Sequence, residues 1–173
     1  MSFSLYDATV PSFLQIVGSM SALLAKAEAY AAANDIDPTA LIGTKLADDM
    51  LPLGYQVKSV SGHSIKAVEG VREGVYSPDR TPWPADFQGL ATLLTETHTA
   101  LEAVNPDEVN GFVGQDMAFA MGERRMEFTA ENFLMSFSMP NFYFHATAAY
   151  AILRAQGMPI GKMDYMGRPR LKG

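Results

Sequence analysis

Apolar residues recur at steps of three and four positions along four long stretches of this chain. That spacing places them on one face of an α-helix. We predict helices over residues 9–34, about 48–74, 86–105 and 129–156, with a short helical turn at Pro38–Ile42. Long helices joined by short connections favour an all-α fold, an antiparallel four-helix bundle.

The stretch before the last helix has a different period. Met117, Phe119 and Met121 alternate with alanines, and Met126 and Phe128 alternate again beyond a Gly-Glu turn. A period of two around a glycine-containing turn predicts a small β-hairpin. With 173 residues, the chain is long enough for one domain with a sizeable core, and we expect a single domain over 1–173.

Composition narrows the classes of function. Thirteen Lys and Arg against nineteen Asp and Glu give a net charge of −6, which argues against nucleic-acid binding. The absence of cysteine removes disulfides, thiolate metal sites and cysteine nucleophiles. Neither a signal peptide nor a membrane-spanning segment is evident, so we expect a cytoplasmic protein without a membrane partner. Only 18% of residues are charged, which favours a homodimer formed through helix faces.

The last predicted helix is apolar and aromatic nearly all round, as in a helix central to a bundle or buried in an interface. Asn141 and His145 lie four positions apart on it and therefore share a face. Pro140 removes one backbone hydrogen bond in its interior and predicts a kink next to that pair.

Of the three histidines, His63 lies at the edge of the apolar stripe of the second predicted helix, on the same side as Gln56. If the second and fourth helices are neighbours, Gln56, His63, Asn141 and His145 converge on one pocket. His98 on the third predicted helix has no partner at a useful spacing, and we expect it at the surface or core boundary.

Two interpretations of this cluster remain open. As a metal site it offers two imidazoles, His63 and His145, whereas catalytic metal sites use about three protein ligands. As a structural feature, each histidine satisfies one hydrogen bond at the margin of the core. No Gly-x-Ser-x-Gly elbow, phosphate-binding glycine loop or paired carboxylate indicates another chemistry.

Three blocks of sequence resemble a bacterial domain-of-unknown-function family of the DinB-like superfamily, also called DinB/YfiT-like. They are residues 49–53 with Gln56 and His63, residues 140–145 (PNFYFH), and residues 149–154 continued by 157–162. The resemblance extends from Leu5 to Gly167. It implies a four-helix bundle, often dimeric, with a divalent metal held by three histidines, and in some members transferases or isomerases that use low-molecular-weight thiols.

The resemblance assigns His63 to the ligand on the second helix and His145 to the second histidine of a His-x-x-x-His pair. Asn141 stands where the first histidine of that pair would be. We therefore predict a small-molecule binding protein with an altered metal site. One alternative is a metal-dependent enzyme, such as a thiol S-transferase with zinc or nickel on His63 and His145. The other is a dimeric structural or interaction protein.

Overall fold

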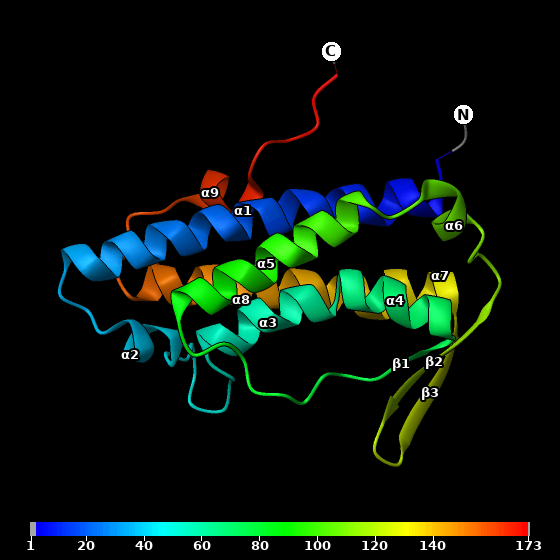
Figure 1. Cartoon of the computed structure of the whole chain (residues 1–173), viewed down its shortest axis with the longest axis horizontal. Helices are drawn as coiled ribbons and strands as arrows, with labels where there is room; N and C mark the ends of the chain where they lie inside the picture. The colour runs from blue at the N-terminus through cyan, green and yellow to red at the C-terminus, as the bar shows by residue number, and fades with distance from the viewer. Residues whose placement is uncertain (1–2, 173) are drawn as a thin grey trace.

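The computed structural model describes residues 3–172, so Met1, Ser2 and Gly173 of the predicted domain lie outside the described part (Figure 1). The protein is mostly helical, with a small three-stranded sheet. Four long helical segments lie side by side. They are α1 (Leu5–Ala33), α3 (Leu53–Gly62) continued by α4 (Ile65–Glu73), α5 (Phe87–Glu102), and α7 (Ala130–Asn132) with η1 (Phe133–Ser138) and α8 (Met139–Ala155).

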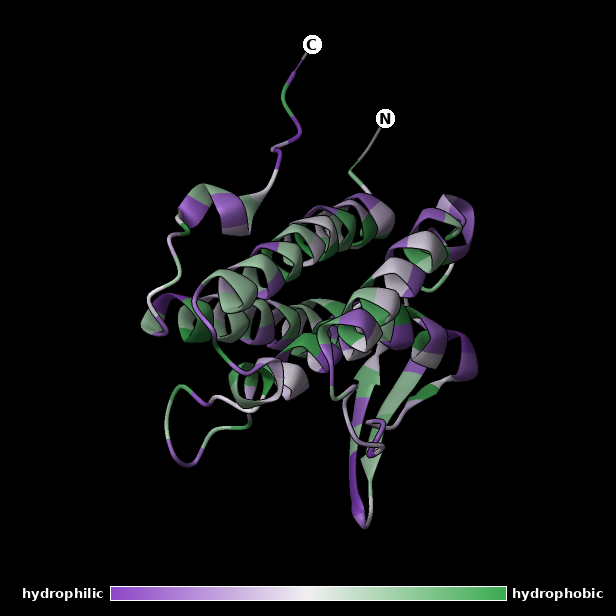
Figure 2. Ribbon diagram, turned by 60° about the vertical axis from the view of Figure 1, so that its left-hand side comes forward, coloured by the Kyte–Doolittle hydropathy of each residue, from purple (hydrophilic) through white to green (hydrophobic). Residues whose placement is uncertain are grey.

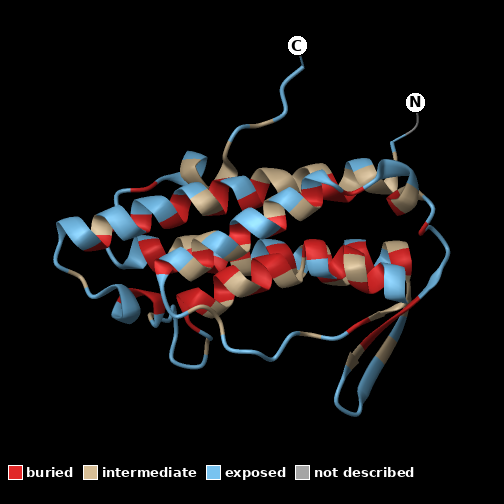
Figure 3. Cartoon of the chain, viewed as in Figure 1, coloured by how far each residue is buried: buried red, intermediate tan, exposed pale blue. Residues whose placement is uncertain are grey.

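These segments pack in a ring, with α1 against α5, α5 against α3, α3 against α8 and α8 against α1. Their inward faces carry the buried residues, while the outward faces are exposed (Figure 3). Hydrophobic residues, green in Figure 2, lie on the same inward faces. Within the core, the rings of Phe13 and Phe142 meet edge to face at 4.8 Å, joining α1 to α8. Aromatic pairs of this kind add stability beyond the area that they bury.

Not all connections are short. After β1 (Val75–Tyr76), residues 77–86 run back along the molecule before α5 begins, so that α5 and the α3–α4 segment point the same way (Figure 1). The prediction of an antiparallel arrangement with short connections is wrong at this crossover, because α5 runs parallel to its neighbour α3. Three short helices complete the chain: α2 (Pro38–Ile42), α6 (Pro106–Asn110) and α9 (Lys162–Met166).

The first helix starts earlier than its sequence pattern indicated. Ser4, not Thr9, is the N-cap, and Ser4 and Asp7 bond reciprocally in a capping box. Because the capping box satisfies two backbone donors there, the helix begins at Leu5, and Pro11 lies inside it, where its ring leaves one backbone hydrogen bond unmade. Thr9 instead donates its hydroxyl to the Leu5 carbonyl within the helix.

The second predicted helix is two helices. α3 begins after Pro52, not at Asp48-Asp49, and it ends at Gly62 with His63 as its C-cap. Ser64 separates it from α4 with φ −116° and ψ −95°, far from helical values. His63 therefore lies at the end of a helix, not within one as predicted. This break aims the imidazole toward the last helical segment.

The sheet pairs β2 (Asp116–Met121) antiparallel with β3 (Arg124–Thr129) around Gly122, which has φ +61°. The sequence did not indicate the third strand. β1 pairs parallel with β2, bringing Tyr76 opposite Phe119. A two-residue strand has no period to detect, and its pairing depends on residues more than forty positions away.

The last predicted helix changes its winding. Residues Phe133–Ser138 form a π-helical segment, and Pro140 follows in the first turn of α8. The proline therefore occupies a position where its missing N–H is tolerated. Wide π turns often occur beside functional sites because they redirect side chains on one face.

Among the described residues, α1 is the one helix long and apolar enough to cross a membrane by length and composition. Half of its most apolar window is buried inside the protein. The core helix of a globular fold meets the same criteria, so this helix alone does not indicate a membrane location.

Candidate functional site

The structure brings three of the four predicted site residues into a chain of contacts between α3 and α8. Gln56 is 2% exposed on α3, and its Oε1 lies 2.7 Å from Nδ1 of His145 on α8. The Gln56 Nε2 donates to the Leu51 carbonyl at 2.7 Å, which fixes the orientation of the amide. Since an amide oxygen can only accept, His145 donates from Nδ1, and its Nε2 keeps a lone pair.

His63 has its own buried partner. Ser138, at the end of the π segment and fully buried, donates its hydroxyl to the His63 carbonyl at 3.0 Å. The same oxygen lies 3.5 Å from His63 Nδ1 and has no second proton to give. It can therefore only accept from Nδ1, over a distance at the limit of a hydrogen bond. Sequence reasoning missed Ser138, which no motif distinguishes from the other serines of the chain.

The two imidazoles face each other. The His63 and His145 rings are nearly parallel, 13° apart in orientation, with centroids separated by 5.6 Å. Burial lowers the pKa of His145 to about 4, and burial followed by the charge of His145 lowers the pKa of His63 to about 4. Both rings are thus neutral at pH 7. Two charged rings at this distance would repel each other in a partly desolvated site.

Asn141 lies one turn before His145 on α8, but its amide nitrogen is already engaged. Nδ2 donates to the Phe137 carbonyl at 2.7 Å. Its side chain therefore caps a carbonyl of the π segment and leaves the Oδ1 oxygen for another partner. The structure thus joins Gln56, His63 and His145 directly, and it ties Asn141 to the backbone beside them.

Aromatic side chains surround the imidazole pair. Tyr55 and Phe144 both stand nearly perpendicular to the His145 ring, with centroids at 5.8 and 5.3 Å. Tyr76 and Phe137 approach the His63 ring at 5.7 and 6.0 Å. Burial raises the pKa of Tyr76 to about 12, so its hydroxyl stays protonated. The missed residues Tyr55 and Tyr76 belong to elements that only the fold brings to the site.

The crossover segment closes one side of this aromatic cluster. Trp83 meets Tyr55 edge to face at 6.1 Å, and its indole lies directly on Gly54. A Cβ at Gly54 would fall 2.3 Å from the indole Cδ1, so only glycine leaves room for the ring. Lys58 on α3 holds the same segment through Asp79 and Thr81. These contacts hold the crossover segment against α3.

The metal ion implied by the DinB-like resemblance does not fit the donors present. Within residues 3–172, no three His, Cys, Asp or Glu side chains gather into a group able to hold a metal. His63 and His145 supply two imidazoles, and Asn141 adds only a neutral amide oxygen. A catalytic metal site normally has three protein ligands with His or carboxylate character. We therefore derive no step through a metal.

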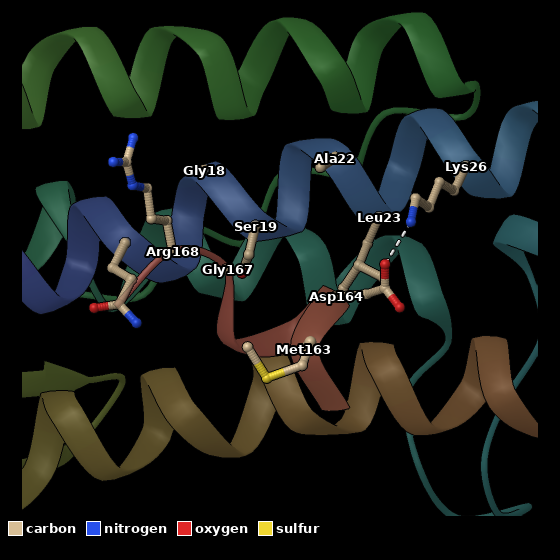
Figure 4. A pocket seen from close by; sticks show the side chains of 10 residues that line it. Gly18, Ser19, Ala22, Leu23, Lys26, Met163, Asp164, Gly167 and Arg168 are labelled. Carbon is tan, nitrogen blue, oxygen red and sulfur yellow. Dashed lines mark hydrogen bonds and ion pairs between the residues drawn. The ribbon is translucent and has the colours of Figure 1, made fainter. Parts of the chain in front are cut away.

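A cavity lies away from the imidazole pair, between α1 and the C-terminal segment. It has a volume of about 390 Å³ and is lined by small residues of α1 and by residues around α9. Lys26 and Asp164 form an ion pair across it (Figure 4). None of the four cavities described on the protein is lined by His63 or His145. The imidazole site therefore coincides with none of these cavities, and α9 packs on α1 instead.

His98 stays apart from this site. Its ring lies on α5 beside Gly18 of α1, and its Nδ1 is 3.5 Å from Glu102, one turn further along the helix. The expectation of a boundary position agrees with this placement, but the expectation that nothing pairs with it is wrong.

Comparisons with known proteins place this arrangement in a family. A domain of unknown function, DUF1993, matches residues 5–166. The chain is also similar to the crystal structure of a DinB family member protein from Shewanella denitrificans, with 27% identity and a TM-score of 0.81. That similarity covers 98% of this chain and 95% of the other. No curated protein matches. The chain therefore belongs to the DUF1993 family, within the DinB-like superfamily.

Proposed function

We propose that this protein binds a small molecule at the imidazole pair between α3 and α8, in a DinB-like four-helix bundle whose metal-ligand set is altered. The observation that carries the proposal is the parallel pair of neutral histidines, His63 and His145. Buried neutral imidazoles are costly to charge, and here both are packed among aromatic rings. Titratable groups with shifted pKa values that collect in one place are a common property of functional sites.

The exposed edge of each ring supports the same proposal. Gln56 and Ser138 hold the Nδ1 edges and are themselves almost completely buried, so these edges face the interior. Both histidines are nevertheless only partly buried. We place the ligand on the side of each ring away from Nδ1, which includes Nε2.

A fragment screen by protein-observed NMR tests the proposal. The ring signals of all three histidines are followed while small molecules are added. We expect the signals of His63 and His145 to shift together for the fragments that bind, while the signals of His98 stay in place. A screen in which no fragment moves the His63 and His145 signals would contradict the proposal.

A pair of variants sharpens this test. His145→Ala should weaken a fragment that binds the site by about tenfold or more, the equivalent of about 1.4 kcal/mol. His98→Ala, which removes a half-buried imidazole outside the site, should leave the affinity unchanged. Equal affinity for the wild-type protein and His145→Ala would remove His145 from the site.

The metal-dependent thiol enzyme is the weaker alternative, because the donor set lacks a third ligand. The homodimer, the cytoplasmic location and the absence of a nucleic-acid or membrane partner remain predictions from the sequence. Light scattering over a range of protein concentrations measures the first of these directly. A monomer at the highest concentration would contradict the predicted homodimer.

A further inference from the structure

Resting on the proposed function, we propose that Gln56 is a positioning residue that fixes the tautomer of His145, and that the site therefore takes a protonated amine or amidine rather than an anion. In this arrangement the ligand donates an N–H to Nε2 of His145. The proposal concerns which chemical class the site accepts, and it can fail while the binding site itself stands.

The hydrogen-bond geometry determines the donor and the acceptor. Gln56 Nε2 is held by the Leu51 carbonyl at 2.7 Å, so Oε1 faces His145 Nδ1 at 2.7 Å. Reversing the amide would place an N–H against Nδ1 and an oxygen against the Leu51 carbonyl, and the second contact would be repulsive. The proton of His145 is therefore on Nδ1. Its Nε2 presents a lone pair at the edge of the ring away from Gln56.

His63 presents the same kind of edge. The hydroxyl proton of Ser138 goes to the His63 carbonyl at 3.0 Å, so its oxygen can only accept from Nδ1 of the ring. The contact to Nδ1 is long, at 3.5 Å, and the tautomer of His63 is held less firmly than that of His145. Two parallel rings 5.6 Å apart then offer acceptors to one small donor molecule.

The surroundings of the pair favour a cation over an anion. A carboxylate or phosphate at this edge would face the Nε2 lone pair of His145. The aromatic rings of Tyr55 and Phe144 flank His145, and Phe144 is 56% exposed. Aromatic faces attract ammonium and guanidinium-like groups. Lys58, the nearby cation on α3, is already paired with Asp79, and the chain carries a net charge of −6.

The first test measures the tautomer without any ligand. Long-range ¹H–¹⁵N correlation spectra at pH 7.5 distinguish a protonated ring nitrogen from a bare one. We expect His145 to have a protonated Nδ1 and a bare Nε2 in the wild-type protein. A proton on Nε2 would overturn the proposal even if Gln56 variants fail to fold.

A variant of Gln56 then tests its role as a positioning residue. Gln56→Leu keeps the size of the side chain and removes the acceptor, so we expect both tautomers of His145 to appear. Gln115→Leu is a matched control, because exposed Gln115 also donates to a backbone carbonyl, that of Gly111 at 2.8 Å. It should leave the His145 signals unchanged. An unchanged tautomer in Gln56→Leu would show that Gln56 does not position the ring.

The ligand class is tested with two probes of the same shape and opposite charge, benzamidinium and benzoate. We expect benzamidinium to shift the His145 ring signals and to bind with a dissociation constant at least about tenfold lower than that of benzoate. A factor of about ten corresponds to the free energy of one hydrogen bond. Equal or tighter binding of benzoate would overturn the ligand class and leave the binding site standing. Shifts with neither probe would also overturn the ligand class. If, in addition, no fragment of the screen above moved the His63 and His145 signals, the proposed function would fail while the tautomer assignment stood.

Discussion

Ser138 ties the π segment to the end of α3 by donating its hydroxyl to the His63 carbonyl at 3.0 Å. The two residues are 75 positions apart, and Ser138 is fully buried. This bond satisfies a carbonyl at the C-terminus of α3 that has no helical partner. It also keeps the His63 ring opposite His145.

Removal of this hydroxyl should destabilise the fold. In Ser138→Ala the His63 carbonyl loses a buried donor, and a loss of about 1–3 kcal/mol is expected for such an unsatisfied group. Urea unfolding followed by circular dichroism measures the change. Ser136→Ala is the matched control, because exposed Ser136 bonds only within its own helical segment, and its effect should stay within about 0.5 kcal/mol. Equal losses in the two variants would contradict this role of Ser138.

Acidification should weaken the fold between pH 6.5 and 4. His63 and His145 have folded-state pKa values of about 4, below the ordinary histidine value of about 6.5, so the unfolded chain binds more protons in this window. Their contribution to the free energy of unfolding is complete above pH 6.5. It is lost as the pH falls toward 4, by up to roughly 3 kcal/mol for each histidine. Unfolding curves from pH 7.5 to 4.5 measure the slope.

A variant assigns this slope to the site. His145→Gln removes one titrating ring, so the loss of stability between pH 6.5 and 4.5 should become smaller. A pH dependence that is the same in His145→Gln and the wild-type protein would place its origin in other groups.

Gly54→Ala should displace the indole of Trp83. The new Cβ would lie 2.3 Å from the ring, and overpacking of this kind costs about 1–3 kcal/mol. Since Trp83 is the one tryptophan of the chain, its fluorescence should report a more solvated ring. Gly18→Ala is the control, because a Cβ there has ordinary contacts at 3.9 Å and a helical alanine is favoured by roughly 0.5–1 kcal/mol. Unchanged fluorescence in Gly54→Ala would contradict the close packing.

Asn141→His should create a zinc or nickel site that the wild-type protein lacks. A third imidazole four positions before His145 shares its helix face and completes the usual three-ligand set with His63. Loss of a supporting group at a metal site costs roughly 10–100-fold in affinity, so a gained ligand should raise affinity by at least that factor. Isothermal calorimetry with zinc measures it. Asn132→His, exposed on α7, controls for an added imidazole. Tight, stoichiometric zinc binding by the wild-type protein would refute the altered-site interpretation.

Sequence patterns predicted the elements whose cause is local. The helical periods of α1 and α5 come from residues three and four apart, and the Asp86 N-cap of α5 is a short-range bond. The four-residue spacing of Asn141 and His145 likewise places both on one face of α8 without reference to the rest of the fold. The local pattern misplaced the start of α1. It predicted a helix from Thr9, whereas the capping box of Ser4 and Asp7 begins the helix at Leu5.

Only the tertiary structure decided how the candidate site is assembled. The Gln56–His145 bond joins residues 89 positions apart, and Ser138 reaches His63 over 75. The apolar period runs through the break between α3 and α4, so no local signal marks the point that turns His63 toward η1. The amino-acid sequence determined which side chains were available and which helix faces carried them. The packing of α3 against α8 determined which nitrogen of His145 is bare, because a tautomer depends on the partner that the fold supplies.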